Sequence, residues 1–282
     1  QVPLSQSLFP LSSPNLPLTE RLANKTALRG KGDFMSAEPL LRRVVRGYTM
    51  RGYDVFAVDS YQLLGKCLIQ NERMYEAEEV FGLCVKIHLK HTGPNMPLTL
   101  EAMADHAEVT TEICKRYEDP YEMEKAELLW RKVVEGRDLA MGSTHPETIE
   151  AMMSLGSCLL ERARMAELSK KGRGGRAPPP VGAKPLRADK AAELEAKKRG
   201  ALNPKMWGAW IDEAEQHHRF AVEARTTAFG AAHPRTVEAQ EELVRTLLAR
   251  LHDWDENAAM VPLKHRPSTR NVDDLRSEAE TL

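Results

Sequence analysis

The residues in this 282-residue chain that could do chemistry are two histidine pairs and one glycine-rich run. His88 and His91 would share one face of a helix, as metal ligands do, but no cysteine or carboxylate completes a four-ligand set at suitable spacing. His217 and His218 are adjacent, and the run GRGGR at 172–176 lacks the Gly-Lys-Ser/Thr ending of a phosphate-binding loop. The sequence therefore predicts no metal, no cofactor and no catalytic residue, and we expect the protein not to be an enzyme.

Two further histidines and the cysteines have structural interpretations. His145 and His233 each precede a proline at the same place in a recurring turn, which favours a role in the turn. The four cysteines form no Cys-x-x-Cys pair, so we expect free thiols buried as small apolar side chains in a reducing compartment. They are Cys67, Cys84, Cys114 and Cys158.

The composition of the chain indicates which fold class holds these residues. Apolar residues make up 42% of the chain and charged residues 29%, which is ordinary for a domain with a real core. Aromatic residues are only 6%, which favours an all-helical chain over a β-sandwich. A net charge of -1 argues against a surface coated for nucleic acid, and no run of 18 apolar residues suggests a membrane span.

A repeated unit organises the chain. Four segments align without gaps, AVDSYQLLGKCL, TLEAMADHAEVT, TIEAMMSLGSCL and TVEAQEELVRTL, which start at residues 57, 99, 148 and 236. Their apolar residues follow the spacing of one helix face. Each of the first three segments is followed by an amphipathic stretch marked by an Ala-Glu pair, at Ala77, Ala126 and Ala214, and one such stretch, marked by Ala37, precedes them all.

The starts are 42, 49 and 88 residues apart, and the extra residues always fall between the first and the second helix of a pair. Because such an insertion lengthens a loop, it leaves the stacking surface intact. We therefore expect a half repeat at 37–50, three helix pairs and a closing helix. The pairs are 57–70 with 75–91, 99–116 with 122–140, and 148–165 with 207–228, and the closing helix is 236–252.

The turns between these units carry the residues that end one helix and begin the next. Gly93, Gly142 and Gly230 are expected in the left-handed region at helix ends, and Pro97, Pro146 and Pro234 cannot continue those helices. Thr99, Thr148 and Thr236 are expected as N-caps whose hydroxyl groups accept a backbone N–H.

The turns GSTHPET and GAAHPRT, the helix TIEAMMSLGSCL and the Glu-Ala-Glu triplets at 76–78 and 213–215 resemble the 42-residue tetratricopeptide repeat (TPR) of the kinesin light chain family. The resemblance covers about residues 37 to 252 without the long insertion. It implies an all-α fold, a right-handed α-solenoid of stacked helix pairs that binds proteins and whose first helices line a concave groove. The coiled coil that binds a motor heavy chain has no counterpart here.

The chain is thus predicted to contain five segments: a Pro/Ser/Leu-rich arm at 1–35, repeats at 36–165, a basic insertion at 166–206, a repeat and closing helix at 207–260, and a tail at 261–282. Residues 166–200 carry a net charge of +6 and include a helix-forming stretch at 186–200. Either this insertion is a solvated loop or it docks on RNA, an anionic surface or an acidic protein. Its basic residues are Lys170, Lys171, Arg173, Arg176, Lys184, Arg187, Lys190, Lys197, Lys198 and Arg199.

The groove that the resemblance implies is acidic in this chain. The third, seventh and tenth positions of each first helix give seven acidic and two basic residues, so a basic or extended segment is the expected ligand. The insertion itself could be that segment. The groove residues are Asp59, Leu63, Lys66, Glu101, Asp105, Glu108, Glu150, Ser154, Ser157, Glu238, Glu242 and Arg245.

These features favour a scaffold or adaptor, an accessory subunit of a larger assembly that binds partners through its groove, its N-terminal arm and its insertion. An RNA-associated repeat protein that uses the insertion on phosphates is the alternative, with no aromatic residues interleaved for base stacking. The expected location is intracellular, in the cytoplasm or a cilium, or in a chloroplast or mitochondrion if a transit peptide preceded Gln1.

Overall fold

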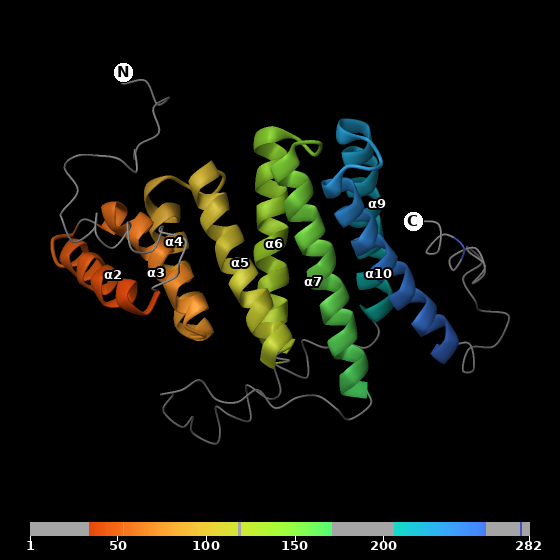
Figure 1. Ribbon diagram of the computed structural model, residues 1–282, viewed down its shortest axis with the longest axis horizontal. Helices are drawn as coiled ribbons and strands as arrows, with labels where there is room; N and C mark the ends of the chain where they lie inside the picture. The colour runs from red at the N-terminus through yellow and green to blue at the C-terminus, as the bar shows by residue number, and fades with distance from the viewer. Residues whose placement is uncertain (1–33, 53, 118–119, 171–205, 258–276, 278–282) are drawn as a thin grey trace. The chain divides into compact units, whose positions relative to one another are not determined.

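The computed structural model describes residues 34–52, 54–117, 120–170 and 206–257 together with Ser277. Helices account for all the regular secondary structure of these residues, and they belong to two compact units, Gln1–His91 and Thr92–Leu282 (Figure 1). The all-α fold of consecutive helix pairs is therefore confirmed, and we describe each unit by itself.

The first unit contains α2 (Phe34–Thr49), the short 3₁₀ helix η1 (Asp54–Ala57), α3 (Val58–Gln70) and α4 (Met74–His91). Helix α3 packs against both α2 and α4. The core between these helices combines small and large side chains. Its fully buried members include Ala37, Leu41, Leu68, Ala77 and Phe81.

The second unit contains α5 (Pro97–Tyr117), α6 (Pro120–Met141), α7 (Pro146–Lys170), α9 (Trp207–Phe229) and α10 (Pro234–Asn257). Each helix packs against the next one, and α7 also touches α5 and α10 (Figure 1). The first helices α5, α7 and α10 therefore form one layer, and the second helices α6 and α9 form the other.

Every predicted helix of the repeat is present, with bounds that differ by a few residues. Helices α5, α7 and α10 begin two residues early, at Pro97, Pro146 and Pro234, because a proline at the first helical position loses no hydrogen bond. Helix α7 continues to Lys170, and Ala166 is buried, so the boundary of the basic insertion at 166 was placed too early.

The turn chemistry corrects the predicted N-caps. The Nδ1 atoms of His145 and His233 accept the backbone N–H groups of Glu147 (3.3 Å) and Arg235 (3.2 Å), so these histidines cap α7 and α10. Thr236, expected to be the cap, lies inside the first turn and its hydroxyl donates to the carbonyl of Gly230 (2.9 Å). Thr99 donates to Gly93 in the same way, and the buried Thr148 occupies the equivalent position.

The turn glycines have positive φ angles, as predicted. Gly230 has φ 89° and ψ 161°, a combination that only glycine adopts freely, although it is not the left-handed helical conformation we expected. The four cysteines are buried and free, as predicted. Trp130, Trp207 and Trp210 are buried as well and belong to the core of the second unit.

Several predictions lie outside the described residues. They concern the N-terminal arm up to residue 33, the basic insertion from 171 to 205 with its helix at 186–200, and most of the C-terminal tail. Among the described helices, none is both long and apolar enough to cross a membrane.

Candidate functional site

Nine of the twelve predicted groove residues lie in the second unit, on its layer of first helices. We call these nine residues the acidic face. Helix α5 carries Glu101, Asp105 and Glu108; helix α7 carries Glu150, Ser154 and Ser157; and helix α10 carries Glu238, Glu242 and Arg245. None of the nine is buried, and α7 lies beside both α5 and α10.

The remaining three predicted residues lie on α3 of the first unit. Asp59 and Leu63 are half-buried and Lys66 is exposed. The charges of Asp59 and Lys66 cancel, so the predicted groove residues of α3 carry no net negative charge.

A buried arginine that sequence reasoning missed neutralises part of the acidic face. Arg225, at the end of α9, is only 2% exposed. Its guanidinium donates to Glu150 of α7 (2.6 Å) and to Glu238 of α10 (3.1 Å). Because one buried charge holds two carboxylates from neighbouring first helices, these glutamates serve the packing of the unit and are less available to a ligand.

This arginine has a counterpart in the preceding repeat. Arg225 also donates to the carbonyl of Arg235 (2.5 Å), and Arg137 donates to the carbonyl of Glu147 (2.9 Å). Both donors stand five residues before a turn glycine and reach a carbonyl ten residues ahead. The sequence signal was therefore present as an Arg-x-x-x-x-Gly spacing at 137–142 and 225–230.

The middle of the acidic face is also internally paired. The hydroxyl of Ser157 donates to Glu242 (3.1 Å), and Arg245 forms an ion pair with the same carboxylate (2.5 Å) one turn along α10. The hydrogen bond from Ser157 joins α7 to α10, and the positive charge of Arg245 balances the negative charge of Glu242.

Helix α5 differs, because its acidic residues have few partners. Glu101, Asp105, Glu108 and Glu112 follow the spacing i, i+4, i+7, i+11 and so form one line along the helix, which we call the acidic stripe. Glu101, Glu108 and Glu112 are exposed, and within the described residues none of these three takes part in an ion pair or hydrogen bond through its side chain. The unneutralised negative charge of the acidic face is thus concentrated on α5.

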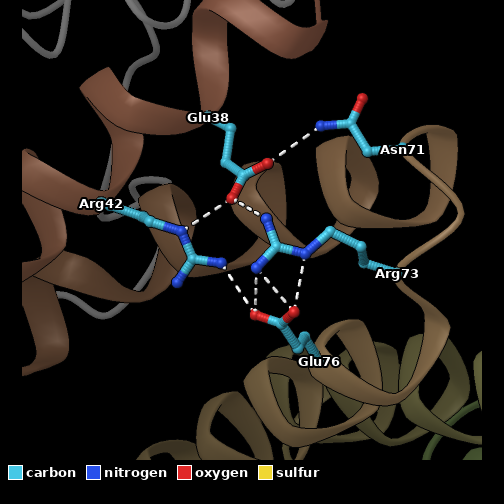
Figure 2. A network of polar contacts seen from close by, with 5 residues as sticks. All are labelled: Glu38, Arg42, Asn71, Arg73 and Glu76. Carbon is cyan, nitrogen blue, oxygen red and sulfur yellow. Dashed lines mark hydrogen bonds and ion pairs between the residues drawn. The ribbon is translucent and has the colours of Figure 1, made fainter. Parts of the chain in front are cut away.

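A second set of charged residues lies between helices and holds them together. In the first unit, Arg42 of α2 donates to Glu38 (2.8 Å) and to Glu76 of α4 (3.0 Å), and Arg73 donates to both glutamates (Figure 2). Asn71 donates to the other oxygen of Glu38 (3.0 Å). Burial raises the pKa of the Glu38 carboxyl, but the hydrogen bonds and the charges of the two arginines outweigh it and hold this pKa below its usual value.

The second unit repeats this network with residues at equivalent positions. Arg131 of α6 donates to Glu127 (2.9 Å) and to Glu213 of α9 (2.5 and 2.7 Å). Arg162 of α7 pairs with Glu127 from the other side and stacks on Trp210, with its guanidinium carbon 4.5 Å from the ring centroid. The hydrogen bond from Arg131 lowers the pKa of Glu213.

The first glutamate of each Glu-Ala-Glu triplet, a residue so far noted only as part of a repeat signature, thus accepts hydrogen bonds from an arginine of the preceding second helix. Because Glu76 and Glu213 form ion pairs with arginines of neighbouring helices, they stabilise the packing of the helices. The ten basic residues of the insertion cannot be compared, since Lys170 ends α7 and the other nine lie outside the described residues.

The histidine pairs separate in the structure. His88 is buried and His91 exposed on α4, while His218 is completely buried and His217 half-buried on α9. Burial lowers the pKa of His88, His217 and His218. Among the described residues, no group of three or more His, Cys, Asp or Glu side chains is arranged to hold a metal ion.

Comparison with known proteins gives structural matches only. Two of the solved chains that are similar are a protein from Podosopora anserina, described as a kinesin light chain with nearly identical TPR-like repeats, and a single-residue variant of it. The identities are 16% and 17%, the TM-scores are 0.33 and 0.34, and each match covers 79% of this chain and 93% of the other. No family model and no curated protein matches the sequence. The repeat of helix pairs described above is therefore inferred from the helices of this chain and not from these matches.

Proposed function

We propose that the protein is a non-enzymatic interaction scaffold, an accessory subunit of a larger assembly, that binds a basic extended segment of a partner protein along the acidic stripe of α5. The observation that carries this proposal is the difference between α5 and its neighbours. On α7 and α10 the carboxylates are held by Arg225 and Arg245, whereas Glu101, Glu108 and Glu112 on α5 have no partner within the described residues.

The line of carboxylates from Glu101 to Glu112 spans about three helical turns, about 16 Å at a rise of 1.5 Å per residue. An extended peptide covers that length with about five residues. A segment with lysine or arginine at alternate positions therefore fits the stripe. Because these carboxylates are exposed, each ion pair adds little affinity, and we expect fast, salt-sensitive binding.

The N-terminal arm and the basic insertion complete the proposal as additional contacts with the assembly. The insertion carries the charge that the stripe attracts, so it also serves as a competing ligand in cis. We favour protein over RNA as the main partner, because the accessible charge of the described second unit is acidic.

Zero-length carbodiimide cross-linking tests the proposed site, since it joins a carboxylate only to an amine in direct contact. We would incubate the full chain with a lysine-rich peptide and map the products by mass spectrometry. The proposal predicts links at Glu101, Glu108 and Glu112. The comparison positions are Glu135, Asp138 and Glu223, which are exposed acidic residues on the second-helix layer. Equal labelling of both sets would show that the stripe has no preference for the peptide.

A further inference from the structure

Helix α10 leaves open the surface that other first helices cover with their own second helix. In the first unit a Cβ atom at Gly65 of α3 would lie 2.6 Å from the ring of Phe81 on α4, and in the second unit Gly156 of α7 has the same tight contact with His218 of α9. The residue of α10 at this repeat position is Val244. It is only half-buried, and no second helix follows α10 among the described residues.

Other residues on this side of α10 are more exposed than their counterparts. Val237 is 40% exposed, whereas the equivalent Leu100 of α5 and Ile149 of α7 are 2% and 4% exposed. Leu248 is 53% exposed. Val237, Val244 and Leu248 form an apolar strip beside a shallow depression that Gln240 and Glu241 also line. A strip of this kind on the last described helix favours an apolar helical occupant.

We propose that the C-terminal residues 272–282 of this chain are that occupant, forming the second helix of a fourth pair. The core positions of the three known second helices are spaced by three, four and three residues. Residues 272–282 (VDDLRSEAETL) repeat this spacing with Val272, Leu275, Ala279 and Leu282. The established sets, all buried, are Met74, Ala77, Phe81 and Cys84 on α4; Met123, Ala126, Trp130 and Val133 on α6; and Ile211, Ala214, His218 and Ala221 on α9.

The sizes of the facing residues agree with this register. In α3 and α7 a glycine faces the large third member of the set, Phe81 or His218. In the proposed pair the sizes are reversed, because Val244 would face the small Ala279. The summed volume at the contact stays similar, which is what tight helix packing requires.

The connection to α10 is also consistent with the rest of the chain. Fourteen residues separate Asn257 from Val272, and the chain's other insertions likewise fall between the first and second helix of a pair. Ser277, a described residue inside the proposed segment, is helical. The inference does not rest on the proposed function, since it concerns how the chain completes its own fold.

Disulfide trapping in the full-length chain tests the contact. The double variant Val244→Cys, Ala279→Cys should form an intramolecular disulfide at least about 10-fold faster than Val244→Cys, Ser277→Cys. The reason is that the residues of α4, α6 and α9 equivalent to Ser277 are exposed to solvent. The native cysteines are buried and interfere little. Equal rates, or disulfides only between two chains, would overturn the proposal, the second result in favour of a second copy as occupant.

A stability measurement gives an independent test. Leu275→Asp and removal of residues 271–282 should each lower the unfolding midpoint of the second unit by about 5 °C and speed amide exchange in α10, whereas Ser277→Asp should do neither. If all three variants match the wild type, residues 272–282 do not cover α10, and the apolar strip is open to a partner helix.

Discussion

Gly156 of α7 and His218 of α9 lie so close together that a methyl group at Gly156 would overlap the Nε2 atom of the histidine. His218 takes the place that Phe81 has in the first unit, so a polar ring fills a position that elsewhere is apolar. Its Nδ1 atom is 2.7 Å from the hydroxyl of Thr246, and Nε2 is 3.3 Å from the carbonyl of Met153. These contacts from two other helices leave the ring no room to move.

The Gly156→Ala substitution should therefore destabilise the second unit by about 2 kcal/mol, the cost of overpacking a filled core. Gly208→Ala is the matched control, because a Cβ atom there meets no atom within 4 Å, and it should be neutral or slightly stabilising. All four tryptophans belong to the second unit, so their fluorescence in a urea titration reports on this unit. Equal effects of the two substitutions would contradict the tight contact.

Acid should weaken the second unit through His218. Burial lowers the pKa of His218 in the folded state, outweighing the backbone contact with Met153 and the charge of Glu242, while the charges of His217 and Arg245 lower it further. The unfolded chain therefore binds a proton first, and the stability is complete above pH 6.5 and is lost as the pH falls below it. One such group contributes a loss of about 1 kcal/mol between pH 6.5 and 5.5.

The variant His218→Phe should remove this part of the pH dependence and still fold, because Phe81 fills the same position against Gly65. The exposed His91 provides the control, and His91→Gln should keep the wild-type slope of unfolding free energy against pH. If His218→Phe keeps that slope as well, His218 is not the source of the acid sensitivity.

The buried ion pair between Arg162 and Glu127 should matter much more than surface pairs. Arg162→Ala would leave Glu127 with Arg131 alone and would remove the stacking on Trp210, so we expect a loss of about 3 kcal/mol. Arg164, two residues further along α7, makes an exposed pair with Glu161, and Arg164→Ala should cost less than about 1 kcal/mol. Urea titrations of both variants measure the difference, and similar losses would contradict the structural role of the network.

Neutralising the basic insertion should strengthen binding of a basic peptide if the insertion competes in cis. Replacement of the nine basic residues between 171 and 200 by serine keeps the loop length and should lower the peptide Kd about 5-fold. A shuffled insertion of the same composition should bind as the wild type does. An unchanged Kd after neutralisation would refute the competition.

The sequence predicted the helices well because each recurring turn contains a glycine that ends one helix and a proline that begins the next. Pro146 can only begin a helix and Gly142 can only end one cheaply, so the end of α6 and the start of α7 were predicted to within two residues. The hydroxyl of Thr236 was misjudged because a threonine two positions inside a helix and a capping threonine have the same local sequence. His233 was the actual cap, which a preference scale for N-caps does not favour.

The candidate site was predictable in part. Periodicity placed Glu150 and Glu238 on one side of their helices, and the structure confirms that neither is buried. Periodicity could not show that Arg225 reaches both carboxylates, because this pairing joins residues 75 and 13 positions apart through the packing of three helices. Glu112 lies within the predicted helix 99–116 but beyond the aligned segment TLEAMADHAEVT, so the repeat positions did not include it in the groove.

The most direct test of the central claim is the affinity of a fluorescent lysine-rich peptide for two matched variants. The triple change Glu101→Lys, Glu108→Lys, Glu112→Lys reverses the stripe, and Glu135→Lys, Asp138→Lys, Glu223→Lys makes the same change of net charge on the second-helix layer. We predict that the first variant weakens binding by about 10-fold at low salt and that the second stays close to the wild type. Equal weakening by both variants, or none by the first, would contradict the assignment of the stripe as the binding site.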